Sequence, residues 1–170
     1  MTVFHVLLLV TTLLCSLVAG FLFAFAVVVM PGIRRLDDRN FIRAFQVIDG
    51  VIQNNQPLFV LVWLGSVLCA VAAGALGLSA LSGLERVLLI IAALVYVLGV
   101  QVPTFVVNIP LNNRLQKLDA ETMAEREQKR ARDEFEPRWN KWNSIRTVLA
   151  TVASILLLLV LAAVSPAARG

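Results

Sequence analysis

Residues 57–81 read PLFVLVWLGSVLCAVAAGALGLSAL and contain no charged side chain. An α-helix rises about 1.5 Å per residue, so about 20 apolar residues cross the hydrocarbon core of a bilayer. Residues 3–30, 87–107 and 145–164 have the same apolar character and sufficient length. We therefore predict an all-α integral membrane protein with four spans at these positions. Short antiparallel turns favour an up-down-up-down bundle, and the whole chain, residues 1–170, is expected to form this single domain.

The composition supports this class of protein. Hydrophobic residues make up 59% of the 170 residues, which is above the share found in soluble domains. The formal net charge of +4 does not indicate nucleic-acid binding, because the basic residues lie among acidic ones in the connecting loops. Membrane lipid is therefore the expected partner, and nucleic acid is not.

Metal and cofactor chemistry has few candidate residues. His5 is the only histidine, so one chain cannot build a multi-histidine metal site or a bis-histidine haem site. We expect no metal and no cofactor. Cys15 and Cys69 both fall near the middle of predicted spans. Buried free thiols are favoured there, and a disulfide would require the two helices to touch at that level.

The distribution of basic residues predicts the orientation in the membrane. The long connections, residues 31–56 and 108–145, lie on one side, and the turn at 82–86 lies on the other side with both termini. Of the 15 Lys and Arg residues, all but Arg86 and Arg169 lie on the side of the long loops. The positive-inside rule then places these loops in the cytoplasm and both termini outside, with the plasma (inner) membrane as the expected location.

Both long loops are expected to contain helix. Phe41, Phe45, Ile48 and Ile52 share one helical face, which predicts an amphipathic helix that ends at Asn54 and lies at the membrane surface or folds back into the mouth of the bundle. Residues 119–136 are highly charged and predict a solvated helix that ends before Pro137. The fourth span would then be a separate helix.

A polar ladder interrupts the third predicted span. Its members, spaced at i, i+3, i+7 and i+11 on one helical face, are Gln101, Thr104, Asn108 and Asn112. Pro103 and Pro110 leave backbone carbonyls there without their helical donors. A buried amide in hydrocarbon costs several kcal/mol unless it is hydrogen-bonded, so these side chains should face protein, water or a ligand.

A second cluster opens the fourth span. Trp139, Trp142, Asn143 and Arg146 follow the spacing i, i+3, i+4 and i+7, and they lie at the same end of the bundle as the ladder and Gln46. Each residue alone has an ordinary interpretation. Tryptophans anchor at membrane interfaces, arginines extend to headgroups, asparagines cap helices, and Gln101 could join two helices. Together they predict a polar and aromatic pocket for a small molecule.

These motifs resemble the anthrone oxygenase-like family of small four-span membrane proteins, long catalogued as a domain of unknown function. The matching features are Met30-Pro31-Gly32, Phe45-Gln46 with Asn54, Asn108-Ile109-Pro110-Leu111-Asn112, and Trp139-xx-Trp142-Asn143-xx-Arg146. The resemblance covers almost the whole chain and implies the four-span fold. Some fungal members insert oxygen into an anthrone to give an anthraquinone. The resemblance therefore implies cofactor-independent oxygenation of an apolar aromatic or polyketide-like substrate.

The residues can be matched to that chemistry. A deprotonated anthrone methylene is electron-rich enough to react with oxygen without a metal. Four residues are expected to be catalytic by stabilising the enolate or peroxide anion: Asn108, Asn112, Asn143 and Arg146. The expected substrate-binding residues are Gln46, Asn54, Gln101, Thr104, Trp139 and Trp142, with both indoles stacking on the rings. No general base lies at this level unless Asp49 folds inward.

Two other functions stay open. A non-catalytic lipid- or quinone-binding protein would use the same pocket. An assembly subunit of a membrane complex, or a homo-oligomer, would need an exposed seam of small residues, for which Ala70, Gly74 and Gly77 are candidates. A transporter is less favoured, because no acidic or basic residue lies in the middle of a span to couple ions.

Overall fold

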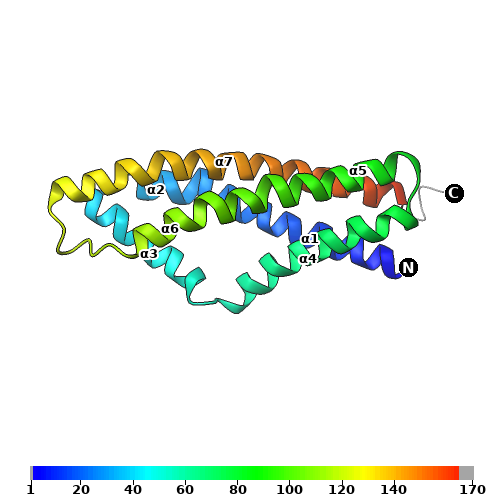
Figure 1. Ribbon diagram of the computed structural model, residues 1–170, viewed down its shortest axis with the longest axis horizontal. Helices are drawn as coiled ribbons and strands as arrows, with labels where there is room; N and C mark the ends of the chain where they lie inside the picture. Colours follow the sequence, from blue (N-terminus) through cyan, green and yellow to red (C-terminus); the bar gives the residue numbers. More distant parts are fainter. Residues whose placement is uncertain (1, 165–170) are drawn as a thin grey trace.

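Four long helices dominate the computed structural model, which describes residues 2–164 (Figure 1). They comprise Val3–Ile33, Pro57–Ala80, Gly83–Gln116 and Glu125–Val164, and each is long and apolar enough to cross a membrane. No strand occurs between residues 2 and 164. The N-terminus and the short turn between the second and third helices lie at one end of the bundle, and both long connections lie at the other. The predicted all-α, four-helix membrane bundle is confirmed.

The first long helix continues past the predicted span 3–30 and ends at Ile33. It consists of α1 (Val3–Ala24), a π-helical turn η1 (Phe25–Val29) and α2 (Met30–Ile33). The Met30 backbone N–H donates to the Phe25 carbonyl, which closes the wider turn. Pro31 then falls in the first turn of α2, where a missing N–H is tolerated.

The third long helix has the same arrangement twice, and it extends beyond the predicted span 87–107 at both ends. Its segments are α5 (Gly83–Leu94), η2 (Val95–Gln101), η3 (Thr104–Asn108) and α6 (Ile109–Gln116). Pro103 follows η2 and Pro110 follows η3, each by two residues, as Pro31 follows η1. A proline lacks the N–H and its ring clashes with the carbonyl four residues earlier. A π turn shifts the hydrogen-bond register before the proline, so the helix can continue.

The first long connection folds back into the bundle. It forms α3 (Asp38–Gln53), whose Phe41, Ile42 and Phe45 are fully buried against α6 and α7. The sequence allowed this helix to lie at the membrane surface or in the mouth of the bundle, and the structure places it in the mouth. The Asp37 carboxylate caps α3 by accepting the Asn40 N–H, and the hydrogen bonds from Asn40 hold the pKa of the Asp37 carboxyl below its usual range. This cap therefore stabilises the helix above the ordinary carboxyl pKa and is lost as the pH falls through the lowered value.

The charged stretch and the fourth span form one helix, so the predicted break before Pro137 was wrong. Helix α7 (Glu125–Val164) is continuous and carries Pro137 in its interior. An interior proline costs about 3 kcal/mol through its lost hydrogen bond and ring clash. Phe135 and Trp139, on either side of it, are buried against Phe45 of α3, with ring centroids 4.7 and 5.5 Å from the Phe45 ring. This packing offsets the cost and holds the helix together.

Helix α4 (Pro57–Ala80) uses its small residues inside the bundle. Ala70 and Gly77 are buried, and a Cβ atom at Gly77 would lie 2.4 Å from the Leu89 side chain of α5. A Cβ atom at Gly74 would lie 3.2 Å from the Ala93 Cβ. Ala70 and Gly77 of the proposed exposed seam are therefore buried, and Gly74 and Gly77 lie against α5, where small side chains permit close approach of the two helices.

The apolar core of the bundle runs along α1, α4, α5 and α7. Cys15 is buried in it and Cys69 is partly buried, and both are free thiols as predicted. Beside them, the Tyr96 and Ser66 hydroxyls share a hydrogen bond of 2.6 Å. A second, aromatic core at the loop end joins α3, α6 and α7 through Phe41, Phe45, Phe135 and Trp139.

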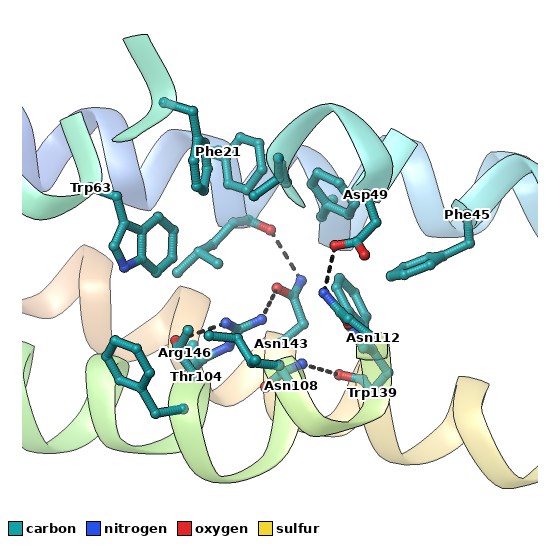
Figure 2. A pocket seen from close by; sticks show the side chains of 16 residues that line it. Phe21, Phe45, Asp49, Trp63, Thr104, Asn108, Asn112, Trp139, Asn143 and Arg146 are labelled. Atoms are coloured by element: carbon teal, nitrogen blue, oxygen red, sulfur yellow. Dashed lines mark hydrogen bonds between the residues drawn. The ribbon is translucent and has the colours of Figure 1, made fainter. Parts of the chain in front are cut away.

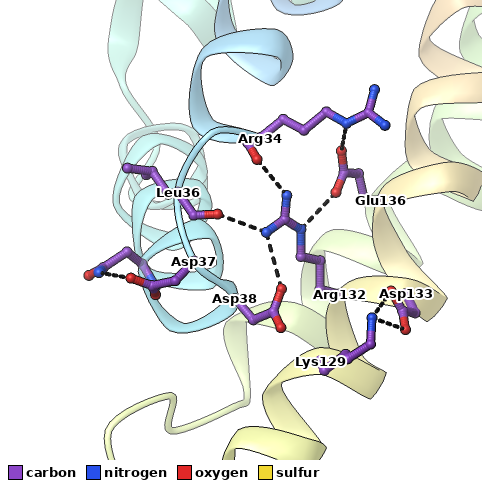
Figure 3. A network of polar contacts seen from close by, with 9 residues as sticks. Arg34, Leu36, Asp37, Asp38, Lys129, Arg132, Asp133 and Glu136 are labelled. Atoms are coloured by element: carbon purple, nitrogen blue, oxygen red, sulfur yellow. Dashed lines mark hydrogen bonds and ion pairs between the residues drawn. The ribbon is translucent and has the colours of Figure 1, made fainter.

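Arg132 of α7 holds the turn that precedes α3 against α7 (Figure 3). Arg132 donates to the Arg34 carbonyl at 2.7 Å and to the Leu36 carbonyl at 2.9 Å. It also pairs with Asp38 at 3.1 Å and with Glu136 at 2.8 Å, and its guanidinium lies 4.4 Å from the centre of the Phe41 ring. Only 14% of the Arg132 side chain is exposed, and its partner Glu136 is 13% exposed.

Replacing Arg132 with methionine should lower the free energy of unfolding by about 3 kcal/mol, because the Glu136 carboxylate, which is 13% exposed, loses its closer basic partner and the Arg34 and Leu36 carbonyls lose a donor. Thermal unfolding in detergent, followed by circular dichroism, measures the loss. The control is Arg130→Met, which breaks an exposed i,i+4 pair with Glu134 and should cost about 0.5 kcal/mol or less. Equal losses in the two variants would show that Arg132 is an ordinary surface residue.

Candidate functional site

A cavity of about 180 Å³ lies at the loop end of the bundle (Figure 2). Its walls come from the first long helix, α3, the start of α4, the polar part of the third helix, and α7. The lining residues are Phe21, Leu22, Phe25, Phe45, Asp49, Ile52, Phe59, Trp63, Thr104, Phe105, Asn108, Ile109, Asn112, Trp139, Asn143 and Arg146. The cavity exceeds the engineered one of about 150 Å³ that binds benzene, so a small aromatic ligand is of suitable size.

Arg146 is the central polar group of this cavity. It is 4% exposed and donates to the Thr104 hydroxyl at 2.9 Å and to the Asn143 Oδ1 at 3.0 Å. Its Nε has no hydrogen-bond partner, and no carboxylate in residues 2–164 pairs with it. The Trp139 ring lies 5.9 Å from its guanidinium carbon, which adds a cation–π contact. The structure thus buries a cation among neutral partners.

Backbone carbonyls of the helices fix the partners of Arg146. Asn143 donates to the Leu22 carbonyl of α1 at 3.1 Å, which turns its oxygen toward Arg146. Thr104 donates to the Val100 carbonyl at 2.7 Å and so accepts from Arg146. Asn143 lies one turn before Arg146 on α7, whereas Thr104 belongs to η3, so the packing of η3 against α7 brings the second acceptor to the guanidinium group.

Asn108 adds a second incompletely bonded group. Its amide nitrogen lies 3.4 Å from the Trp139 carbonyl, an orientation that turns Oδ1 away from that carbonyl. Oδ1 has no partner, although the residue is only 2% exposed. A buried donor on Arg146 and a buried acceptor on Asn108 are therefore both incompletely satisfied, and both residues line the same cavity.

A hydrogen-bonded chain crosses from α3 to α7 through α6. Asp49 is 3% exposed, and its Oδ1 accepts from Asn112 at 2.7 Å. The Asn112 oxygen in turn accepts from the Trp139 indole nitrogen at 2.8 Å. Gln53 and Gln116 donate to the other Asp49 oxygen at 2.7 and 3.0 Å. Asp49 therefore folds inward, and it determines how Asn112 presents its oxygen to the indole.

The remaining walls are apolar and largely aromatic. The Phe59 and Trp63 rings of α4 stack with centroids 5.3 Å apart, and Phe21 lies 5.3 Å from Phe59. Phe105 is 61% exposed and Ile109 is 37% exposed on the outer surface of the third helix, although both also line the cavity. The cavity thus has polar groups at its inner end and an apolar rim at the outer surface of the bundle.

The structure brings together six of the predicted site residues: Thr104, Asn108, Asn112, Trp139, Asn143 and Arg146. Four others do not line the cavity. Gln46 donates to the Leu115 and Leu118 carbonyls and joins α3 to the end of α6. Asn54 is exposed at the C-terminus of α3, and Trp142 packs, partly buried, beside the aromatic core. Gln101 accepts from the Trp63 indole at 3.0 Å and so positions a lining residue from behind.

The sequence analysis included Asp49 in the site only on the condition that it folds inward, and it did not identify the aromatic lining residues of α1 and α4. The signal for Asp49 was present, because it follows Phe45 by four residues and therefore shares its buried helical face. No comparable signal marked Phe21, Phe59 or Trp63, which lie in uniformly apolar stretches. Within residues 2–164, no group of three or more His, Cys, Asp and Glu side chains could hold a metal ion.

Replacing Asn112 with alanine should lower the free energy of unfolding by about 2 kcal/mol, because it leaves the Trp139 N–H without its acceptor and removes one donor from Asp49. Thermal unfolding measures the loss, and near-ultraviolet circular dichroism reports the altered Trp139 environment. Asn113→Ala is the matched control, since Asn113 is the exposed neighbour with a single 3.3 Å contact to Gln53. Identical spectra and stability for both variants would contradict the role of this chain.

Comparison with known families gives an independent assignment. The anthrone oxygenase family matches residues 51–156, which include α4, the third long helix and most of α7. The matched range contains five residues around the guanidinium group: Thr104, Asn108, Trp139, Asn143 and Arg146. Neither the curated proteins nor the solved structures include a match. The match covers more than half of the chain and agrees with the resemblance carried by its motifs, so the protein belongs to the anthrone oxygenase family.

Proposed function

We propose that the cavity binds a flat, apolar aromatic molecule carrying an acidic group, and that the protein oxygenates it without a cofactor. In this reaction a ring methylene loses a proton and its electron-rich anion reacts with dioxygen. The resulting peroxide takes up a proton and loses water, so that CH₂ and O₂ become C=O and H₂O. Family membership supports the reaction class, and the lining of the cavity supports the shape and charge of the substrate.

The observation that carries this proposal is the buried guanidinium group of Arg146 without a carboxylate partner. Burying such a cation costs several kcal/mol, and neutral acceptors on Thr104 and Asn143 offset only part of that cost. An anionic oxygen on the ligand would supply the missing interaction. Donors fixed in advance in a site of low polarity stabilise an oxyanion by about 3–4 kcal/mol each.

The other lining groups have separate roles in this proposal. The unpaired Asn108 oxygen would accept a hydrogen bond from a ligand hydroxyl. Aromatic walls at Phe21, Phe59 and Trp63 would pack on the rings. Asp49 is the carboxylate that lines the cavity and is the proposed acceptor of the methylene proton. The exposed apolar rim at Phe105 and Ile109 would admit a substrate dissolved in the bilayer.

A non-catalytic binding protein for a quinone or lipid is the second candidate. One observation favours it: both Asp49 oxygens already accept hydrogen bonds, from three amide groups in all. These bonds hold the carboxylate in place, so it is less free to reach a proton on a ligand. Binding alone would need Arg146 and the aromatic walls but no proton acceptor. Turnover and binding therefore have to be measured separately.

The orientation in the membrane forms part of the proposal. The cavity lies at the end of the bundle that holds the two long, basic connections. The positive-inside rule assigns this end to the cytoplasmic leaflet of the plasma (inner) membrane, with both termini outside. A substrate made in the cytoplasm would then reach the cavity from the inner leaflet.

Purified protein supplied with emodin anthrone should consume oxygen and produce quinone absorbance faster than the spontaneous reaction. Arg146→Gln should lower the rate about 100-fold or more, because one preformed oxyanion donor is lost. Arg130→Gln, an exposed change at the far end of α7, should leave the rate unchanged. Binding of the corresponding quinone, followed by tryptophan quenching, separates the two candidates. Binding without turnover would favour the non-catalytic function, and neither binding nor turnover would remove this ligand class.

A further inference from the structure

A second hollow, of about 430 Å³, lies between the first long helix and α7. Its polar lining includes Arg34, Arg35, Asn140 and Ser144, and Met30 and Pro31 supply part of its apolar side. Within the described part of the chain, no acidic residue lines it. Asn143 borders both this hollow and the cavity around Arg146, so the two spaces are neighbours on either side of one side chain.

The hollow lies at the level where two helices leave the hydrocarbon. The apolar run of the first long helix ends at Ile33, and that of α7 begins at Ile145. Val27 and Val28, which are 49% and 65% exposed, precede the hollow on the first long helix, and Val148, which is 60% exposed, follows it on α7. An elongated ligand could therefore place a polar head in the hollow and lay hydrocarbon along these valines.

The polar groups of the hollow have spare hydrogen-bonding capacity. Arg34 contacts Glu136 through Nε at 3.5 Å, and Figure 3 shows its two terminal nitrogens pointing away from that carboxylate. Glu136 is shared with Arg132, so it neutralises neither guanidinium alone. Among residues 2–164, no ion pair involves Arg35, and no side-chain hydrogen bond involves Asn140 or Ser144. The site thus offers positive charge and neutral donors to an anion.

We propose that this hollow binds the phosphate group of an anionic phospholipid. Arginine suits a phosphate because its planar group presents several donors at fixed angles. The Asn140 amide and the Ser144 hydroxyl would complete the contacts with the phosphate oxygens, and the acyl chains would lie along the exposed valines. This hollow is distinct from the proposed oxygenation cavity. The lipid-binding proposal can therefore be tested independently of the oxygenation proposal.

Native mass spectrometry of the full chain tests the proposal by counting bound lipids. The protein is purified in detergent and mixed with phosphatidylglycerol or phosphatidylcholine of the same acyl composition. We expect one tightly held phosphatidylglycerol and at least tenfold weaker retention of phosphatidylcholine. Arg34→Gln/Arg35→Gln should reduce phosphatidylglycerol retention about tenfold. Arg126→Gln/Arg138→Gln, which removes the same charge from exposed positions of α7 that do not line the hollow, should retain it.

Asn140→Asp provides a second test that keeps both arginines and places a carboxylate in the hollow. It should also abolish the selective retention, and circular dichroism confirms that each variant is folded. Equal retention of the two lipids by the wild type would overturn the proposal, as would full retention by both the double arginine variant and Asn140→Asp. Stabilisation by inorganic phosphate alone, without phosphatidylglycerol retention, would show a free-phosphate site and would also overturn it.

Discussion

The structure depends on providing hydrogen-bond partners for polar groups inside an apolar bundle. The guanidinium group of Arg146 needs such partners most, because it is charged and buried. A cation at this depth needs acceptors, because water is largely excluded and no carboxylate pairs with it within residues 2–164. Thr104 and Asn143 provide two acceptors, and each is held in place by a hydrogen bond to a backbone carbonyl. The third guanidinium nitrogen, Nε, has no hydrogen-bond partner among the described residues. The hydrogen bonds of Asn143 and Arg146 therefore add to apolar packing in positioning α1, η3 and α7.

The prolines determine how the helices present these groups. In the first and third long helices, each proline is preceded by a π-helical turn, and the helix continues past it. Two of these turns, η1 and η3, contribute Phe25, Thr104, Phe105 and Asn108 to the cavity. A π turn changes the direction in which the following side chains point. The same feature that accommodates the proline thus also helps to shape the cavity.

The part of the chain outside the membrane spans completes the site. Helix α3 closes the mouth of the bundle by burying Phe41 and Phe45, and this places Asp49 at the cavity. Arg132 fastens the preceding turn to α7, and Gln46 fastens α3 to the end of α6. These contacts join residues far apart in the sequence, so the geometry of the cavity depends on the loops as well as on the spans. The family match begins at residue 51, so Phe45 and Asp49 of α3 contribute to the cavity from outside the matched range.

The sequence by itself determined the four spans, because their apolar length and lack of charge leave no other stable placement. It also identified one polar helical face and the cluster around Arg146, since spacing along a helix fixes which side chains share a face. Tertiary structure alone decided that α7 continues through Pro137, that the small residues of α4 pack inside the bundle, and that Phe59 and Trp63 face the cavity. Gln101 and Trp142 shared the predicted faces but lie outside the lining. Local periodicity specifies a face, whereas the contacts between helices decide what that face meets.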